Sequence, residues 1–460
     1  MMTLDLATFG QEHLTEQAAK LSPESARLLN DQIAEIDFAQ LEALVKAQDK
    51  NVDWGALAEQ ATSPPAVKLG EPHPEFSEAE AKKVGEDALK SGKVGMILVA
   101  GGQGTRLGFD KPKGMFPIGP ISNRTLFQMH CDKLLAMMKK YSVSIPMYVM
   151  TSPATDQQTK QFFEEHNRCG LSEDQLRIFC QGTMPAVDSE SGKVLLAAAD
   201  QIALSPDGHG GLVAALSKNG CLAEAEQQGI EYFYYAQVDI PLAQLCDPVL
   251  IGYHILAKSQ MTTQVVQKRF ATEKVGNVVE VDGKVQIIEY SDLPESVAEQ
   301  TNDDGSLRLW AGNIAVHVFD RSFLAGVVDS ADGLPFHRAS KKVPFINDAG
   351  ELVNPESPNA IKFERFVFDL LPLSKNSIVV EGDATQVFAP VKNANGAEVD
   401  TPKHTQDALL SIHRAWLENA GAKLAEGVRV EIHPDWASDE SEVASKIDAG
   451  LSFEADTFLR

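Results

Sequence analysis

The sequence has few cysteines, no long apolar run and no excess of basic side chains. Its five cysteines among 460 residues show no paired metal-ligand spacing, and an odd number argues against a disulfide framework. No apolar run approaches the roughly 18 residues of a membrane span, and the first residues lack the pattern of a signal peptide. The 41 basic and 65 acidic side chains give a formal charge of −24, which repels nucleic acids and anionic membranes. We therefore expect a cytoplasmic protein with reduced thiols that binds neither nucleic acid nor membrane.

The length exceeds the size at which a single hydrophobic core usually stops growing. Residues 1–90 carry apolar side chains at helical spacing, and a Pro-containing stretch over 63–74 is typical of a linker. The last part holds one helical segment, the strand-like GVRVEIHP and an acidic stretch. We predict a helical N-terminal region over 1–90, a central domain over 91–394 and a small C-terminal domain over 395–460.

The central region alternates short apolar runs with helical segments. The runs are VGMILVA, MYVMTS, LRIFCQ and YFYYAQVD, and this alternation predicts βαβ units and a mostly parallel sheet. Further strands are predicted in TTQVVQK, VGNVVEV, KVQIIEY and LRLWAGNIAVHVF, with Asp282-Gly283 as a two-residue hairpin turn. The fold class is therefore α/β, a mixed sheet flanked by helices.

The most informative segment is MILVAGGQGTRLGFDKPKGMFPIG. A predicted strand over 96–100 leads into three glycines, Gly101, Gly102 and Gly104. Without Cβ atoms, their backbone N–H groups can approach phosphate oxygens and a flat base. Thr105 and Arg106 can add a hydroxyl and a guanidinium to such a site.

Lys113, between Pro112 and Gly114, places a point charge on a restrained backbone, where it can neutralise charge that develops at an α-phosphate. A tight turn is the ordinary interpretation of a lone glycine pair, but GGxGTRLG followed by PKG is more specific. Gly102, Gly104 and Gly108 are spaced GxGxxxG, which differs from the dinucleotide-binding GxGxxG, and no Ser or Thr follows Lys113 as in a P-loop. The segment by itself indicates nucleotidyl transfer.

Asp239 follows the apolar strand YFYYAQV. It should lie at the carboxyl edge of a parallel sheet, where ligands of such folds bind. A carboxylate there can hold Mg²⁺, which commonly takes one or two carboxylates together with substrate phosphates. The alternative interpretation is a turn or a helix cap.

Several further blocks accompany the glycine-rich segment, and together they resemble the eukaryotic-type UTP:sugar 1-phosphate uridylyltransferase family. They are QGTMPA at 181–186, SPDGHGG at 205–211, VVQK, IIEYSD, AGNIAVH, IKFERFVFD and FAPVKNA. Within that family the chain is most similar to the UDP-N-acetylglucosamine pyrophosphorylases, roughly over residues 90–435.

The resemblance implies a glycosyltransferase A type of nucleotidyltransferase domain, with Rossmann-like topology. The expected enzyme makes UDP-sugar and pyrophosphate from UTP and a sugar 1-phosphate, chiefly N-acetylglucosamine 1-phosphate, with Mg²⁺ or Mn²⁺. We expect a monomer or a weak homo-oligomer.

The resemblance also assigns roles to residues. The catalytic residues would be Arg106, Lys113 and Lys392, with Asp239 as the metal ligand. Substrate would be bound by Gly101, Gly102, Gly104 and Thr105 for UTP, Gln181 and Gly208 for uracil, Glu289 and Asn313 for the sugar, and Lys362 for phosphate. His209 is a further substrate-binding candidate.

Two positions depart from the family pattern. His209 stands where the acetylglucosamine enzymes usually have Asn, as in the glucose and broad UDP-sugar branches; it could equally be a helix-entry residue. A UDP-glucose or broad-range UDP-sugar pyrophosphorylase is therefore the alternative, followed by a non-catalytic UDP-sugar binder. Ile240 replaces the Asn of the family's VDN block, which should alter the metal site without abolishing it.

Overall fold

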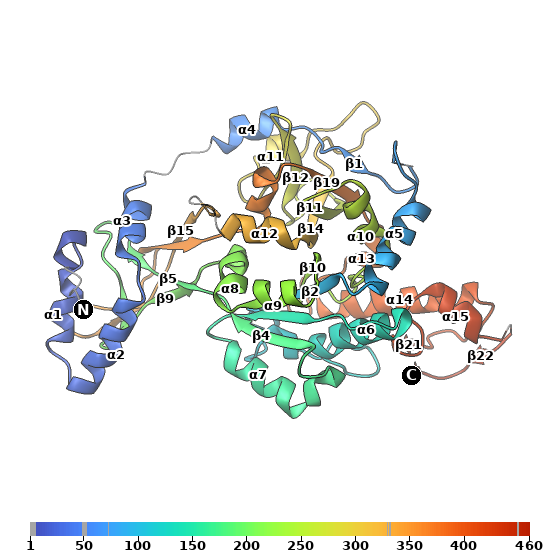
Figure 1. Ribbon diagram of the computed structural model, residues 1–460, viewed down its shortest axis with the longest axis horizontal. Helices are drawn as coiled ribbons and strands as arrows, with labels where there is room; N and C mark the ends of the chain where they lie inside the picture. The colour runs from blue at the N-terminus through green and yellow to red at the C-terminus, as the bar shows by residue number, and fades with distance from the viewer. Residues whose placement is uncertain (1–5, 48–52, 72, 329, 331–332, 449) are drawn as a thin grey trace. The chain divides into compact units, whose positions relative to one another are not determined.

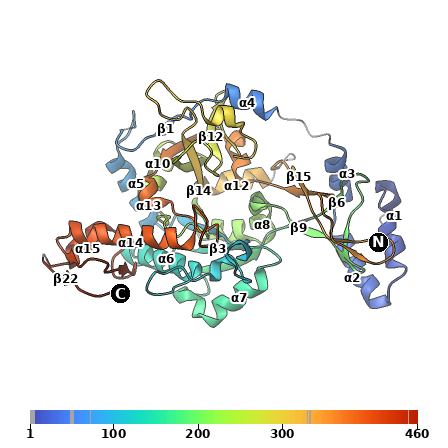
Figure 2. The same ribbon diagram turned by 180° about the vertical axis from the view of Figure 1, so that it is seen from behind.

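The computed structural model describes residues 6–47, 53–71, 73–328, 330, 333–448 and 450–460 (Figures 1 and 2). The chain forms two compact units. The first unit comprises residues 1–53, 181–214 and 331–369, and the second comprises 54–180, 215–330 and 370–460. Each unit therefore combines segments that are distant along the chain. The predicted domains over 1–90, 91–394 and 395–460 are consecutive ranges, and they stay a prediction.

The second unit is built on a ten-stranded mixed sheet in the order β1-β19-β11-β14-β10-β2-β3-β4, with the β12–β13 hairpin attached. Its four strands β10, β2, β3 and β4 run parallel to one another. They span Tyr232–Gln237, Val94–Val99, Met147–Thr151 and Leu176–Cys180, respectively. The predicted parallel core of an α/β fold is confirmed.

The other half of the sheet supplies the antiparallel additions. Strand β14 (Ala311–Asp320) is antiparallel to both β10 and β11 (Met261–Gln267), and β19 (Ser377–Glu381) is parallel to β11. The predicted hairpin joins β12 (Asn277–Val281) to β13 (Lys284–Ile288). Asp282 and Gly283 have φ of 52° and 73°, as a two-residue turn of this kind requires.

One local prediction was wrong. The Pro-containing stretch over 63–74, predicted as a linker, contains β1 (Ala66–Val67), which pairs with β19 at the edge of the sheet. Backbone pairing at a sheet edge needs no particular side-chain pattern, so the two-residue strand left no signal in the sequence.

Helix α6 (Leu126–Tyr141) covers the sheet with the face that the spacing predicts. Its Phe127, Cys131 and Leu134 are fully buried in the main core, and a capping box at Thr125 and Gln128 begins the helix. Helices α5 (Glu78–Lys90) and α10 (Pro248–Leu256) pack against each other and against the same core.

The C-terminal part of the second unit has a small core of its own. Helix α14 (Pro402–Asn419) packs on α15 (Glu440–Lys446) and on β21 (Val430–Ile432). Leu417, Val443 and Phe453 are among the side chains that this core buries. Figure 1 shows this part in orange and red beside α6.

The first unit contains α1 (Glu12–Ala18), α2 (Pro23–Ala34) and α3 (Phe38–Lys46), as predicted for a helical N-terminal region. These helices share a core with Val187, Val194 and Phe363. A three-stranded sheet of β15 (His337–Lys341), β18 (Ala360–Glu364) and β6 (Val187–Asp188) completes the unit. In neither unit does a described helix combine the length and the apolar character needed to cross a membrane.

Candidate active site

The glycine-rich loop after β2 folds back on itself. The Gly104 N–H donates to the Lys111 carbonyl at 2.9 Å, and the Lys113 N–H donates to the Gly102 carbonyl at 2.9 Å. Because these two bonds close the loop, Lys113 lies beside Gly102 although the two are eleven positions apart in the sequence. The Gly101 carbonyl accepts a bond from the Ser152 hydroxyl at 2.7 Å, which fixes the start of the loop.

The glycines of this loop have different physical roles. A Cβ on Gly104 would lie 2.8 Å from Phe109, and one on Gly114 would lie 2.2 Å from the Phe127 ring, so both glycines are required by packing. A Cβ on Gly102 would meet nothing within 4 Å. Gly102 therefore leaves open space in front of the loop, and Thr105 and Arg106 beside it are exposed.

Asp239 lies next to this loop because β10 pairs in parallel with β2, with Gln237 opposite Val99. The Lys113 Nζ is 2.9 Å from the Asp239 Oδ2, and Asp239 is only 7% exposed. Burial raises the pKa of Asp239, but the charges of Lys113 and Lys392 outweigh it, and the net pKa lies below its usual value. Asp239 is therefore an ionised carboxylate held between two lysines.

The second oxygen of Asp239 fits a metal ligand. Its Oδ1 is buried and, in the part of the chain that the structure describes, has no hydrogen-bond partner. A buried carboxylate oxygen without a partner is costly unless a cation or donor completes it. Across the described ranges no three His, Cys, Asp or Glu side chains cluster, so Asp239 fits a site in which Mg²⁺ takes its other ligands from water and phosphates.

The buried His130 and the half-buried Lys133 of α6 hold the loop that carries Asp239. The His130 Nε2 is 2.9 Å from the Val238 carbonyl, which can only accept, so Nε2 carries the proton. Burial lowers the pKa of His130 to about 4, and the ring is neutral at pH 7. The Lys133 ammonium donates to the carbonyls of Pro241 and Ala243.

Ile240, the departure beside Asp239, is a buried core residue. Its side chain is 3% exposed and belongs to the main hydrophobic core of the second unit. The residue at this position therefore contributes packing under the loop, and the exchange of Asn for Ile adds an apolar side chain to that core.

Lys392 lies in the segment that follows α13 (Ala384–Val387). The Val391 N–H donates to the Asp239 carbonyl at 2.8 Å, so the segment that carries Lys392 lies directly against the Asp239 loop. The N–H groups of Lys392 and Asn393 both donate to the Asp400 carbonyl, at 2.9 Å and 3.0 Å. The structure thus brings together Lys113, Asp239 and Lys392, which the sequence places far apart.

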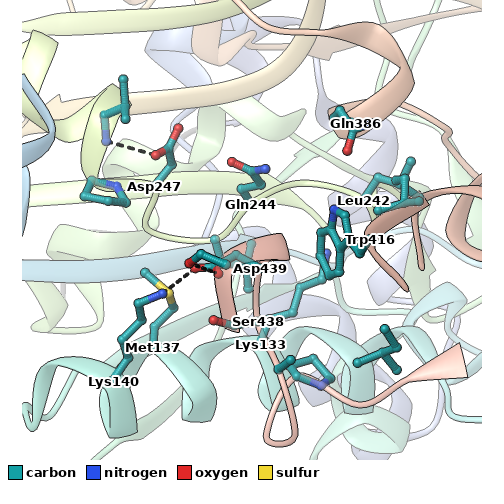
Figure 3. A pocket seen from close by; sticks show the side chains of 18 of the residues that line it. Lys133, Met137, Lys140, Leu242, Gln244, Asp247, Gln386, Trp416, Ser438 and Asp439 are labelled. Atoms are coloured by element: carbon teal, nitrogen blue, oxygen red, sulfur yellow. Dashed lines mark hydrogen bonds and ion pairs between the residues drawn. The ribbon is translucent and has the colours of Figure 1, made fainter. Parts of the chain in front are cut away.

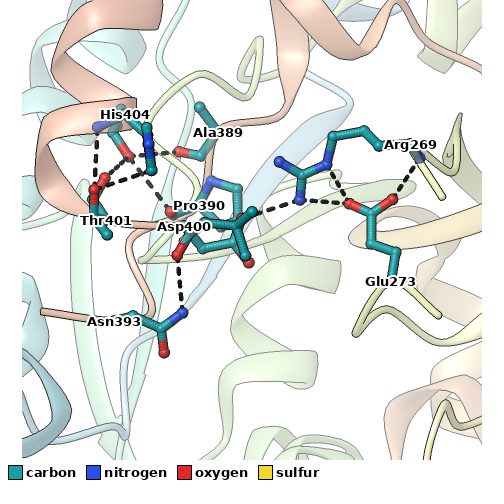
Figure 4. Close-up of polar contacts among 10 residues, drawn as sticks. Arg269, Glu273, Ala389, Pro390, Asn393, Asp400, Thr401 and His404 are labelled. Carbon is teal, nitrogen blue, oxygen red and sulfur yellow. Dashed lines mark hydrogen bonds and ion pairs between the residues drawn. The ribbon is translucent and has the colours of Figure 1, made fainter. Parts of the chain in front are cut away.

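An arginine that the sequence analysis missed holds this segment (Figure 4). The Arg269 guanidinium lies 3.2 Å from the Asp400 Oδ1 and donates from Nε to the Glu273 Oε1 at 2.6 Å. Burial lowers the pKa of Arg269, but the two carboxylates raise it more, and the net pKa lies above its usual value. Arg269 directly follows the VVQK block, which is the signal that could have identified it.

Glu289 and Asn313 converge on Gly276. The Asn313 N–H donates to the Gly276 carbonyl at 2.8 Å, and a Cβ on Gly276 would lie 2.9 Å from the Glu289 Oε1. A bulge in β14 shifts the pairing from Val316 to Asn313, and Ala315 within it has a φ of 55°. Because β14 runs antiparallel to β10, its start lies at the edge where β10 ends and Asp239 follows.

Four predicted residues belong to the first unit, namely Gln181, Gly208, His209 and Lys362. Gly208 has a φ of 82°, and a Cβ there would lie 2.3 Å from the Arg365 carbonyl. The His209 Nδ1 accepts from the Val367 N–H at 3.1 Å, and burial followed by the nearby His337 lowers its pKa to about 4. Gln181 is buried, and Lys362 lies on β18 opposite Ala339. Their roles toward substrate stay predictions.

Known proteins resemble this chain over most of its length. The family described as UTP–glucose-1-phosphate uridylyltransferase matches residues 38–431, a range that begins well before the predicted start near residue 90. A protein of Saccharomyces cerevisiae named UDP-N-acetylglucosamine pyrophosphorylase is 39% identical over 363 residues, 77% of this chain and 76% of its own. A human protein named UDP-N-acetylhexosamine pyrophosphorylase-like protein 1 is 37% identical over 446 residues, 93% of this chain and 86% of its own.

A solved structure agrees with these relatives. The uridine diphosphate N-acetylglucosamine pyrophosphorylase of Trypanosoma brucei, in complex with an inhibitor, has a TM-score of 0.80 and 26% identity. The similarity covers 96% of this chain and 93% of that one. The predicted fold class and enzyme class are confirmed, and the chain belongs to the UTP–glucose-1-phosphate uridylyltransferase family.

Proposed function

We propose that this enzyme transfers the uridylyl group of UTP to N-acetylglucosamine 1-phosphate and releases pyrophosphate. The observation that carries the proposal is the meeting of Lys113, Asp239 and Lys392 at the carboxyl edge of the sheet, beside the open face of Gly102. Two cations beside one buried carboxylate suit a reaction in which a phosphate attacks another phosphate.

The reaction is a direct in-line displacement. An oxygen of the sugar phosphate attacks the α-phosphorus of UTP, a new P–O bond forms, and the bond to the bridging oxygen breaks. Pyrophosphate leaves with that electron pair. Because the attacking phosphate is already anionic, no side chain has to remove a proton.

The side chains act by position and charge. Lys113 and the exposed Arg106 neutralise charge on the UTP phosphates, and Lys392 holds the sugar phosphate in line. Asp239 would hold Mg²⁺, or Mn²⁺, through its buried Oδ1. When bound, such an ion supplies Lewis-acid neutralisation of the phosphate oxygens.

The choice of sugar rests on the relatives, whose names refer to acetylglucosamine or acetylhexosamine. Glu289 and Asn313 beside Gly276 offer an acceptor and an amide for sugar hydroxyls or an acetamido group. His209 bonds to the Val367 backbone within its own unit, so it gives no positive reason to prefer glucose.

The direct experiment measures pyrophosphate release from UTP and Mg²⁺ with a panel of sugar 1-phosphates. We expect the highest kcat/KM with N-acetylglucosamine 1-phosphate, and no turnover after chelation of the metal until Mg²⁺ or Mn²⁺ is restored. Preference for glucose 1-phosphate would overturn the choice of sugar. Binding of UDP-sugar without turnover of any sugar would overturn the reaction. We also expect a cytoplasmic location and a monomer or weak homo-oligomer, which fractionation and sedimentation can test.

A further inference from the structure

A cavity of about 430 Å³ lies within the second unit, on the other side of the loop that follows Asp239 (Figure 3). Side chains of α6, the start of α10, α14 and the segment before α15 line it. This volume lies in the range of about 300–1,000 Å³ that small-molecule sites occupy. None of the predicted site residues contributes to its lining.

One wall of the cavity is apolar, whereas charged and polar side chains make up about half of the lining as a whole. Leu242, Leu409 and Ile412 are buried side chains that form a separate hydrophobic cluster, and the half-buried Trp416 packs against it. Figure 3 shows Leu242, Trp416 and Gln386 close together on one side of the cavity. A flat aromatic or aliphatic body therefore finds contact surface here.

Two amides at the cavity, one on the exposed Gln244 and one on the half-buried Gln386, are open to a ligand in place of water. The side chains of Gln244 and Gln386 line the cavity, and no hydrogen bond of the described chain engages either amide. Each amide offers two donors and one acceptor. A ligand with one donor next to one acceptor, as in an amide or a lactam, would match such a group.

The charged side chains of the lining already have partners. Lys140 pairs with Asp439 and Glu442, and the Asp247 carboxylate accepts from the Val249 N–H at 2.9 Å. Burial lowers the pKa of Lys133 to about 8 and raises that of Asp247 to about 6. The surroundings therefore disfavour further charge, although the exposed Lys82 stands among the lining residues.

The cavity is connected to the active site through Lys133 and Leu242. Lys133 lines the cavity and also donates to the Pro241 and Ala243 carbonyls of the loop that carries Asp239. Leu242 projects from that same loop into the cavity wall. A molecule bound there would contact the supports of the Asp239 loop without touching Asp239.

We propose that this cavity is a second binding site for a neutral small molecule that has a flat apolar ring and an amide or lactam edge, and that its occupancy changes kcat through the Asp239 loop. The binding does not depend on the proposed reaction, whereas the effect on kcat rests on it.

The test uses the full chain and 2-quinolinone, a neutral bicyclic lactam, as the probe. Saturation-transfer NMR measures probe binding with and without saturating UTP and Mg²⁺. We expect binding that UTP leaves unchanged, weakened about 2- to 10-fold by Gln244→Ala, the range for one lost hydrogen bond. Gln386→Trp, which places a large ring at the cavity wall, should abolish it.

Gln158→Ala is the matched control, because Gln158 is exposed on α7 (Asp156–Glu165), away from the cavity lining. Circular dichroism establishes that every variant is folded. Displacement of the probe by UTP, or equal binding to wild type and Gln386→Trp, would overturn the proposed site. If the probe binds but kcat is the same with and without it, the coupling to the Asp239 loop is wrong. An inactive wild type would contradict the proposed reaction and leave the binding result to decide the site.

Discussion

Lys113 pairs with the Asp239 carboxylate and the charge of Lys392 acts on the same group, but the chain holds the two lysines in different ways. The backbone of Lys113 is fixed by its own loop, through the bond to Gly102 and the packing of Gly114 on Phe127. The segment of Lys392 is fixed by distant residues, because Val391 bonds to Asp239 and the Asp400 carbonyl accepts from Lys392. The position of Lys113 therefore depends on local sequence and that of Lys392 on tertiary contacts, and the two should respond to different substitutions.

The largest effect should follow the loss of the carboxylate that both lysines share. Asp239→Asn removes the charge between them and the oxygen that would hold the metal, a contribution of several kcal/mol or about a thousandfold in kcat. Pyrophosphate release and Mg²⁺ titration calorimetry measure the two losses. Asp110→Asn, an exposed change in the neighbouring loop, is the control. Normal Mg²⁺ binding by Asp239→Asn would contradict the metal assignment.

The Arg269–Asp400 ion pair, which supports the segment of Lys392, can be removed by substitution of either residue. Arg269→Ala and Asp400→Ala should each lower kcat/KM for the sugar 1-phosphate about 10- to 100-fold, the range for residues that orient a functional side chain. The KM for UTP should change little. Because the two side chains act as one pair, the double variant should be no worse than the worse single variant.

Arg429→Ala is the matched control for this pair, since Arg429 forms an ion pair with Asp456 at the exposed C-terminal end of the chain. Arg269→Lys is a further variant, which keeps the positive charge but loses the planar guanidinium. It should retain more activity than Arg269→Ala. Equal losses of kcat/KM for both substrates would indicate general destabilisation in place of a positioning role.

The local support of Lys113 can be examined with two glycines of one loop. Gly114→Ala places a Cβ against Phe127 and should lower the free energy of unfolding by about 1–3 kcal/mol. Gly102→Ala meets open space, so its free energy of unfolding should stay within about 0.5 kcal/mol of wild type. The KM for UTP should nevertheless rise about tenfold, or about 1.4 kcal/mol, because the new methyl group occupies the face that approaches phosphate. Urea unfolding measures the free energy of unfolding of both variants, and steady-state kinetics measures their KM for UTP. An unchanged KM in Gly102→Ala would contradict the role of Gly102 in UTP binding.

The smallest effect on catalysis is expected at Ile240. Ile240→Asn restores the family residue but buries an amide in the core, at a cost of about 1–3 kcal/mol in the free energy of unfolding. We expect a lower Tm and no gain in kcat. A higher kcat would show that the side chain at 240 reaches the substrate.

The sequence allowed the α/β fold, the parallel strands and the glycine-rich loop to be predicted because each has a local cause. Apolar periodicity specifies the strands and α6, and glycine spacing specifies the loop. The position of Asp239 could also be predicted, because a carboxylate directly after a buried strand lies at the ligand-binding edge of the sheet.

Arg269, Asp400, His130 and Lys133 could not be predicted in the same way. They act on backbone carbonyls or on each other across more than 100 residues, and no spacing in the sequence records such contacts. Lys392 was identified by family resemblance alone, and the structure supplies the reason for its place, the bond from Val391 to Asp239. The burial of the Ile240 side chain likewise depends on the packing beneath the loop.

The most direct test of the central claim is pyrophosphate release by Lys113→Ala with UTP, Mg²⁺ and N-acetylglucosamine 1-phosphate. The expected result is a kcat about 10²–10³ lower, the usual loss when one preorganised charge-stabilising group is removed. Binding of the UDP-sugar product should weaken far less, and Lys111→Ala, an exposed lysine of the same loop, should turn over normally. Unchanged turnover by Lys113→Ala would contradict the proposed role of the lysine that pairs with Asp239.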